Sequence, residues 1–333
     1  MKILITGDTG YIGSHTSIEL INQGHEIIIV DNLINSKKSV LDTIANLTGI
    51  KPKFYQVDLT DQQATDQIFT DNDLDLVIHF AGLKAVAESV EKPLEYYRNN
   101  LDSTFNLLNS MQSHGVNKII FSSSATVYGE QNAERYSEDM PTGTGITNPY
   151  GQTKFMIEQI LQDIAVANPN FSAVILRYFN PVGAHPSGLL GEDPNGIPNN
   201  LMPVVTNVYR GIIPKLSIYG NDYPTADGTC ERDFIHVVDL AKGHLAAIQA
   251  LNTPGAHVYN LGTGQATSVK SIVEKFEAIS GKPLPHQYVS RREGDLASIC
   301  ADPTKAQKEL NWRTELTIDD AIRDTLNFIN QKP

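Results

Sequence analysis

The stretch that decides the fold is Gly7-Asp8-Thr9-Gly10-Tyr11-Ile12-Gly13, which comes just after the apolar run at residues 3–5. Its glycines recur at intervals of three, and residues 11–23 carry apolar side chains at helical spacing. In such a strand–loop–helix unit, the glycines permit a tight turn, a close approach of the backbone to a diphosphate, and close helix–strand packing. The helix N-terminus adds unpaired N–H groups and a partial positive charge. The pattern therefore predicts a dinucleotide phosphate site at Gly7, Gly10, Tyr11, Ile12 and Gly13.

Short apolar runs alternate with helical stretches through the first half of the chain. The expected strands are residues 2–6, 26–30, 53–57, 76–80, 118–122 and 172–178. The longest expected helices are residues 94–114 and 150–168. Strands that are apolar at consecutive positions are covered on both faces, as in a parallel sheet flanked by helices. The alternation predicts an α/β fold with a doubly wound, Rossmann-like parallel sheet.

The rhythm changes after residue 178. Residues 180–200 are rich in glycine and proline, which predicts a long ordered loop of the kind that binds ligands. Shorter elements follow, with strands at 216–219 and 258–261 and helices at 238–251, 269–279 and 317–330. We expect a cofactor domain at residues 1–178, with a late strand from about 234–237. Residues 179–333 would form mainly a smaller α/β substrate-binding domain.

Charge and cysteine content exclude several classes of protein. Lys and Arg number 26 against 38 Asp and Glu, so the net charge is −12, which disfavours nucleic acid and anionic membranes as partners. The two cysteines lie seventy positions apart, which favours ordinary thiols over a disulfide framework or a metal site. The nine histidines form no metalloprotease pair, so no metal is expected. With no signal peptide and no long apolar run, the expected location is the cytoplasm.

Two carboxylates end the second and third expected strands. Asp31 can accept hydrogen bonds from the adenosine ribose and would repel a 2′-phosphate, which favours NAD over NADP. The neighbouring Lys37 and Lys38 are interpreted as solvated. Asp58 has two open interpretations, a contact to the adenine amino group and a helix N-cap.

Tyr150 and Lys154 lie at positions i and i+4 of an expected helix that opens after Pro149. Side chains at this spacing share one face, so the phenol and the ammonium would be neighbours. Of thirteen tyrosines, Tyr150 alone has a lysine four positions on. An adjacent lysine and a cationic nicotinamide ring could together lower the pKa of the phenol enough for it to act as a base. Ser124 leaves a strand at the same sheet edge, where its hydroxyl could bond a substrate oxygen.

These features, in this order, resemble the extended short-chain dehydrogenase/reductase family. Further stretches resemble the branch of that family that epimerises UDP-sugars at C4. They are residues 79–84 (HFAGLK), 122–129 (SSSATVYG), 177–185 (RYFNPVGAH), 199–203 (NNLMP) and 291–295 (RREGD). The likeness runs from Met1 to about Asn330.

The resemblance implies that NAD is tightly bound at the glycine loop and regenerated in each turnover. Further residues implied to hold it are Asp31, Asn32, Asn35, Ser36, Asp58, Leu59, Phe80, Ala81, Gly82, Lys84, Asn99, Ser122, Tyr150, Lys154 and Phe179. The residues implied to bind a UDP-sugar are Lys84, Ser124, Ala125, Thr126, Tyr150, Asn180, Asn200, Leu201, Leu216, Ser217, Tyr219, Arg232, Arg292, Asp295 and Ile299. A homodimer is implied by the resemblance alone.

The reaction implied is the conversion of UDP-galactose to UDP-glucose through a 4-keto sugar. Tyr150 would take the 4-hydroxyl proton, Lys154 would bond the nicotinamide ribose, and Ser124 would position the hydroxyl. Epimerisation of a UDP-N-acetylhexosamine, UDP-uronate or UDP-pentose would use the same chemistry. A 4,6-dehydratase would need a carboxylate beside Ser124, where Ala125 and Thr126 stand. A redox-sensing regulator would have no use for the three catalytic residues together.

Two positions depart from the family pattern. Asp8 stands where relatives carry Gly or Ala, so its side chain must point away from the phosphates or weaken cofactor binding. Ile299 stands where relatives carry Tyr or a smaller residue, a position linked to the acceptance of N-acetylated sugars. Isoleucine is intermediate in bulk and leaves that preference open.

Overall fold

The computed structural model describes residues 1–131, 133–195, 198, 200–292 and 295–332. Asn199, Glu293 and Gly294, which belong to the motifs quoted above, lie outside the described residues. None of the helices in the described ranges combines the length and the apolar character needed to cross a membrane.

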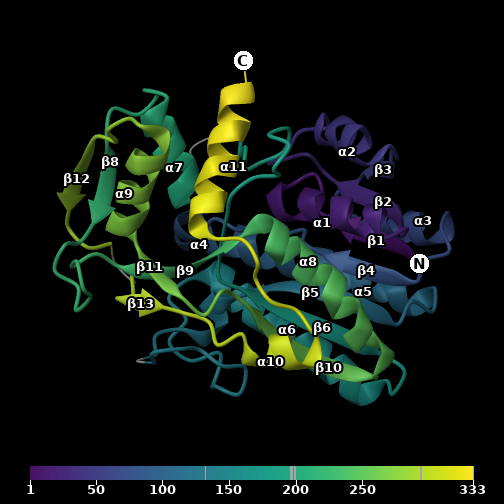
Figure 1. Ribbon diagram of the computed structural model, residues 1–333. Coiled ribbons are helices and arrows are strands. Elements are labelled where there is room, and N and C mark those ends of the chain that lie inside the picture. Colours follow the sequence, from purple (N-terminus) through teal and green to yellow (C-terminus); the bar gives the residue numbers. More distant parts are fainter. Residues whose placement is uncertain (132, 196–197, 199, 293–294, 333) are drawn as a thin grey trace.

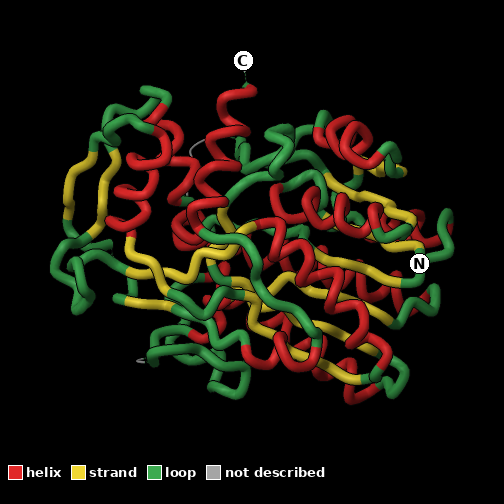
Figure 2. The backbone as a smooth tube through the Cα atoms, viewed as in Figure 1, coloured by secondary structure: helices red, strands yellow, loops and turns green. Residues whose placement is uncertain are grey.

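The larger part of the chain is built on one parallel sheet, which confirms the predicted fold class (Figures 1 and 2). Its spatial order is β10-β6-β5-β4-β1-β2-β3, and every neighbouring pair is parallel. The strands are β1 (Lys2–Thr6), β2 (Glu26–Asp31), β3 (Lys53–Gln56), β4 (Leu76–His79), β5 (Lys118–Ser124), β6 (Ser172–Tyr178) and β10 (Gly255–Leu261). The strand order reverses between β1 and β4, where open α/β sheets form ligand crevices at their carboxyl edge.

Helices cover both faces of this sheet (Figure 2). One face carries α1 (Tyr11–Asn22), α2 (Val40–Thr48) and α8 (Val237–Ala247). The other carries α3 (Gln62–Thr70), α5 (Pro93–Ser113) and α6 (Pro149–Ala167), with α4 (Val86–Glu91) beside α5 and α6. Alternate strand residues point to opposite faces, so Ile3 and Ile5 enter one hydrophobic core and Leu4 the other. Each core is closed by apolar side chains of the helices that cover it.

The second lobe has its own hydrophobic core and two small sheets (Figure 1, left). One sheet joins β8 (Leu216–Tyr219) to β12 (His286–Val289). In the other, β9 (Glu231–His236) pairs with β7 (Asn180–Val182), β11 (Ala266–Ser268) and β13 (Ser298–Ile299). The helices of this lobe are α7 (Leu201–Tyr209), α9 (Val269–Ser280) and α11 (Ile318–Gln331). Three short helices complete the fold, η1 (Ala125–Tyr128), η2 (Ile248–Asn252) and α10 (Thr304–Glu309).

Two sequence predictions about the second half are wrong. The late strand of the large sheet is β10, which runs beside β6 from Gly255 to Leu261, whereas residues 234–237 belong to β9 and the start of α8. Strand pairing is non-local, and an apolar run such as Phe234-Ile235 fits either sheet. The segment 180–200 is not all loop, because β7 occupies its first three residues. Figure 1 shows the chain passing from β13 to α10 beside β10, and then back to α11 in the second lobe.

Candidate active site

The glycine loop joins β1 to α1 and is packed too tightly for side chains at two of its glycines. Gly7 has φ +70°, and a Cβ there would lie 2.7 Å from the backbone N of Ala81. A Cβ on Gly13 would lie 2.6 Å from Cα of Asp8. Gly10 is the N-cap of α1 and has no side chain to cap the first turn. The loop therefore leaves the N–H groups at the start of α1 available to an anion, as a diphosphate site requires.

Asp31 closes β2 and is nearly buried, at 9% exposure. Its Oδ2 accepts a hydrogen bond from the backbone N–H of Thr9 at 3.2 Å. Its Oδ1 accepts hydrogen bonds from the backbone N–H of Leu33 at 2.8 Å and from the Ser36 hydroxyl at 3.1 Å. Thr9 and Ser36 also bond each other, with their hydroxyl oxygens 2.6 Å apart. Asp31 thus ties the glycine loop to the segment after β2, and a ribose contact would use its remaining acceptor capacity.

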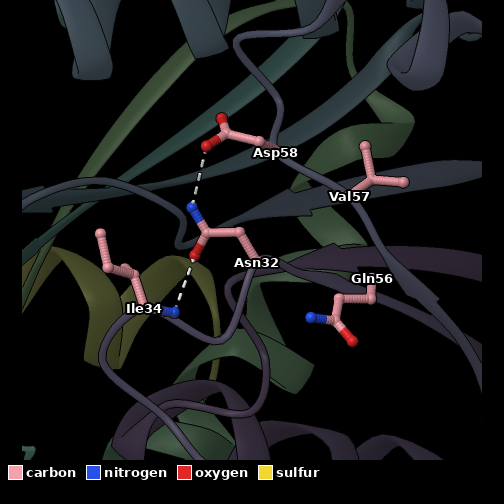
Figure 3. Close-up of a pocket in the computed structure, with 5 residues that line it drawn as sticks. All are labelled: Asn32, Ile34, Gln56, Val57 and Asp58. Carbon is pink, nitrogen blue, oxygen red and sulfur yellow. Dashed lines mark hydrogen bonds between the residues drawn. The ribbon is translucent and has the colours of Figure 1, made fainter.

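An open pocket lies where β2 and β3 end, lined by Asn32, Ile34, Gln56, Val57 and Asp58 (Figure 3). Asn32 Nδ2 donates to Asp58 Oδ2 at 3.2 Å. Partial burial would raise the pKa of Asp58, but hydrogen bonds from Thr60 and Asn32 hold it below its ordinary value. The alternative role of Asp58 as a helix N-cap is wrong, since Asp61 caps α3. Asp58 remains ionised and faces this pocket.

Ser124, Tyr150 and Lys154 come together at the carboxyl edge of the sheet, from the end of β5 and the first turns of α6. Asn148 caps α6 by accepting the N–H of Gly151 at 2.8 Å, which fixes the turn that carries Tyr150. Lys154 Nζ is 5.9 Å from the centre of the Tyr150 ring. It donates to the carbonyl oxygen of Ser122 at 2.6 Å. The predicted i, i+4 pair is therefore formed.

Burial has the largest influence on the pKa values of Tyr150 and Lys154 in the protein alone. Burial raises the pKa of Tyr150, and a hydrogen bond with the Ser124 hydroxyl opposes that rise. Burial lowers the pKa of Lys154 to about 7, and the negative charge of Glu158 opposes that fall. The protein alone therefore keeps the Tyr150 phenol protonated at neutral pH. Any lowering of its pKa must come largely from a bound ligand.

A buried ion pair lies one helical turn beyond Lys154, and no sequence motif predicts it. Glu158 is fully buried, and its two carboxylate oxygens accept Arg177 Nε at 3.0 Å and Nη2 at 2.7 Å. Arg177 Nη1 donates to the Tyr128 hydroxyl at 3.0 Å, and the Ser123 hydroxyl donates to Glu158. Pairing depends on the contact between α6 and β6, which no local motif encodes.

A second cluster contains four of the predicted nucleotide-binding residues. Arg232, on β9, and Arg292 both donate to the carboxylate of Asp295, at 3.3 Å and 2.9 Å. The Arg292 guanidinium carbon is 5.5 Å from the centre of the Tyr219 ring at the end of β8. The side chain of Arg292 is 61% exposed and that of Arg232 is 13% exposed. Two cations and an aromatic ring thus share one surface of the second lobe, with Asp295 offsetting part of their charge.

Comparison with known proteins decides the family. Residues 3–262 match the defining pattern of the NAD dependent epimerase/dehydratase family. The chain belongs to this family. Similar members include UDP-glucose 4-epimerases from Bacillus subtilis (strain 168), 54% identical over 98% of this chain and 96% of the relative, and from Yersinia pestis, 52% identical over 100% and 98%. The structure of UDP-glucose 4-epimerase from Bifidobacterium longum in complex with NAD+ and UDP has a TM-score of 0.97 at 52% identity, covering 100% of this chain and 99% of that one.

Two of the residues predicted to contact a ligand have side chains that cannot reach one. Leu59 belongs to the core under α3 and α5, and Leu216 belongs to the core of the second lobe. Both are nearly inaccessible, so only their backbone groups could touch a ligand. Both leucines fit the apolar pattern of a core, but the family resemblance predicts them as ligand contacts.

The other predicted residues of this epimerase/dehydratase family chain are partly or fully accessible, apart from a few at the buried strand ends. The exposed ones are Asn35, Gly82, Lys84, Asn180, Asn200 and Tyr219. Those of intermediate exposure are Asn32, Ser36, Phe80, Ala81, Asn99, Ala125, Thr126, Leu201, Ser217, Arg232, Asp295 and Ile299. Phe179 and Ser122 are buried. The predicted solvation of Lys37 and Lys38 is confirmed, although Lys37 also pairs with Asp193 at 2.6 Å.

Asn100 is a residue that sequence reasoning missed. It is buried on α5, where its Nδ2 donates to the Leu83 carbonyl at 3.0 Å and to Thr153 Oγ1 at 3.0 Å, and its Oδ1 accepts the Leu83 N–H at 2.7 Å. It therefore fixes the loop that carries Gly82 and Lys84 against α6. The buried face of α5 also carries Ser103, Thr104 and Ser110, so Asn100 does not stand out in the sequence as a polar residue on an apolar face.

Proposed function

We propose that the protein interconverts UDP-galactose and UDP-glucose by inverting the sugar at C4. UDP-glucose 4-epimerases are similar to this chain over nearly its whole length, with 52–54% sequence identity. The structure of one of them matches this fold with a TM-score of 0.97. The observation that carries the proposal is the meeting of Ser124, Tyr150 and Lys154 at the carboxyl edge of the sheet. The proposal assigns the nucleotide of a UDP-sugar to the cluster of Arg232, Arg292 and Tyr219 in the second lobe.

The chain's residues fit NAD as cofactor. The glycine loop admits no Cβ at Gly7 or Gly13 and leaves the start of α1 free for a diphosphate. Asp31 would face the adenosine ribose and Asp58 the adenine, beside the pocket of Figure 3. We infer that residues 1–178 and β10 hold NAD and that residues after 179 mainly hold the UDP-sugar. The chemistry that NAD would supply there is reversible uptake of a hydride from C4, within one turnover.

The residues of the chain move and hold the proton. Tyr150 would take the proton of the 4-hydroxyl, and the Ser124 hydroxyl, which already lowers the pKa of the phenol, would hold that oxygen in place. Lys154 is fixed by the Ser122 carbonyl, so its remaining N–H groups are free to bond a ribose. Its positive charge favours the phenolate. Returning the proton from Tyr150 to the oxygen at C4 completes the reaction with no net redox change.

The defining experiment incubates purified protein with UDP-galactose and no added NAD. We expect UDP-glucose to form until the two sugars reach equilibrium, because NAD should copurify with the protein. The products are identified by chromatography, and released NAD is measured after denaturation. A protein that contains NAD but leaves UDP-galactose unchanged would contradict the proposal.

The same assay addresses substrates with other sugars. Ile299 lies on β13, directly beside Arg232 of β9 in the strand register, so it is placed next to the nucleotide cluster. UDP-N-acetylgalactosamine, UDP-glucuronate and UDP-xylose test the N-acetylhexosamine, uronate and pentose alternatives. We expect UDP-galactose to be turned over with the highest kcat/KM of these four.

We propose a cytoplasmic homodimer. Cytoplasmic location is supported by the two cysteines, Cys230 and Cys300, which are both buried and free. The dimer is supported by apolar side chains left exposed on α4 and α5, namely Val86, Val90 and Leu94. Light scattering of the purified protein should give about twice the chain mass of 36.6 kDa. The mass of a single chain at micromolar concentration would contradict the dimer, but it would not contradict the proposed reaction.

A further inference from the structure

Asp8 lies inside the glycine loop, and its side chain is fully buried. Its Oδ1 accepts the hydroxyl of Ser17 at 2.6 Å. Its Oδ2 is buried and has no hydrogen-bond partner among the described residues. Ser17 belongs to the second turn of α1, so the carboxyl group points along the helix, away from the free N–H groups of the first turn. The family departure at this position is thus accommodated by turning the carboxyl inward.

An ionised carboxylate in this position is poorly stabilised. Buried carboxylates need several donors, and this one has a single hydroxyl. Burial raises the pKa of Asp8 to about 7, the hydrogen bond from Ser17 lowers it, and the negative charge of Asp31 raises it. Two side chains thus act on the pKa of Asp8, the Ser17 hydroxyl from α1 and the charged Asp31 from the end of β2. The proton therefore stays on Asp8 to near neutral pH.

The loop that Asp8 supports is the one proposed to hold the diphosphate. The Cα of Asp8 is so close to Gly13 that a Cβ there would lie 2.6 Å from it. A charge on Asp8 would therefore arise within the loop that is proposed to hold an anion at the start of α1. Like charges repel, so an ionised Asp8 would weaken the binding of that anion.

We propose that Asp8 is a proton-binding residue of the cofactor site, and that NAD is held tightly only while Asp8 carries a proton. This inference rests on the proposed NAD site. Loss of the proton places a negative charge under the diphosphate. At an effective dielectric constant near 20, like charges that are close but not in contact repel enough to weaken binding roughly thirtyfold. By reciprocity, bound NAD should raise the pKa of Asp8 by the corresponding amount.

The test measures NAD retention by the holoenzyme between pH 6 and pH 9. Protein is diluted at each pH, and exchange of bound NAD for isotopically labelled NAD is followed by gel filtration. For the unmodified protein we expect bound NAD to exchange up to roughly thirtyfold faster at the alkaline end of this range than at the acidic end. Asp8→Asn, which keeps the shape without the charge, should retain NAD equally at every pH. Asp61→Asn is the matched control, because asparagine also caps a helix and the pH dependence should stay as in the unmodified protein.

Three outcomes separate the possibilities. An unchanged pH dependence in Asp8→Asn would overturn the inference, and so would loss of NAD by that variant at every pH. Absence of NAD from the unmodified protein even at pH 6 would instead contradict the proposed function. If Asp8→Asn does not fold, Asp8→Gly serves the same purpose. Infrared difference spectra of the unmodified protein should also show the C=O band of a protonated carboxyl group, lost as NAD retention falls.

Discussion

Tyr150→Phe should reduce kcat by roughly 10³-fold while the protein keeps its NAD. Removing a general base costs about 10²- to 10⁴-fold in rate, and phenylalanine preserves the ring that packs beside Lys154. Turnover of UDP-galactose and the NAD content of the same preparation are the two measurements. Tyr259→Phe is the matched control, because that hydroxyl donates to Glu309 at 2.9 Å and takes no part in the candidate site. Loss of NAD together with activity would show that Tyr150 has a structural role.

The pH dependence of the rate is a second test of the role of Tyr150. In the proposed mechanism Tyr150 is the base in its ionised form, so the rate should rise with pH until the phenol is deprotonated. Ser124→Ala removes the hydrogen bond that lowers the pKa of Tyr150. The acidic limb of the profile should therefore move to higher pH, and the rate below it should fall. A profile that keeps its midpoint would mean that Ser124 does not act through Tyr150.

The large sheet could be predicted from sequence because its strands are short, apolar at consecutive positions and separated by helical periodicity. Residues 172–178 were predicted to the residue. The last strand of the sheet could not be assigned in this way. Gly255–Leu261 and Glu231–His236 are both short strands, and only their pairing with β6 or with β7 distinguishes them. That pairing depends on the path of the chain between the lobes.

The candidate site likewise contains features that local sequence predicts and features that depend on tertiary contacts. Gly7 and the pair Tyr150 and Lys154 lie within local motifs. Sequence spacing therefore predicts the tight glycine loop and the proximity of the phenol to the ammonium group. The orientation of Asp8 could not be predicted, because it depends on Ser17 being within 2.6 Å of the carboxyl group. Leu216 shows the opposite failure, where resemblance placed a contact on a side chain that packing removes from solvent.

The buried pair Glu158 and Arg177 was, like Asn100, missed by sequence reasoning. Its loss should have the second large effect. Glu158→Gln would leave the Arg177 guanidinium, 3% exposed, without a counter-charge. Breaking a buried ion pair from one side costs about 3–5 kcal/mol of the free energy of unfolding. Urea denaturation of the variant should show that loss. Glu274→Gln, at an exposed pair with Lys270, should change stability by less than about 0.5 kcal/mol.

Glu158→Gln should also change catalysis through Lys154. The negative charge of Glu158 opposes the effect of burial, so without it the pKa of Lys154 falls below about 7. Because the ammonium is charged only below its pKa, Lys154 would lose its charge at neutral pH and stop favouring the phenolate of Tyr150. The alkaline limb of the pH profile should then move to lower pH.

A second variant separates these two roles of Glu158. The double variant Glu158→Gln/Arg177→Gln carries no unpaired buried charge at the pair, so it should recover part of the lost stability. It still lacks the carboxylate beside Lys154, so its pH profile should stay shifted. If the double variant instead regains the original pH profile, the pair acts only by holding α6 against β6. If both variants keep full stability and the original profile, Glu158 has neither role.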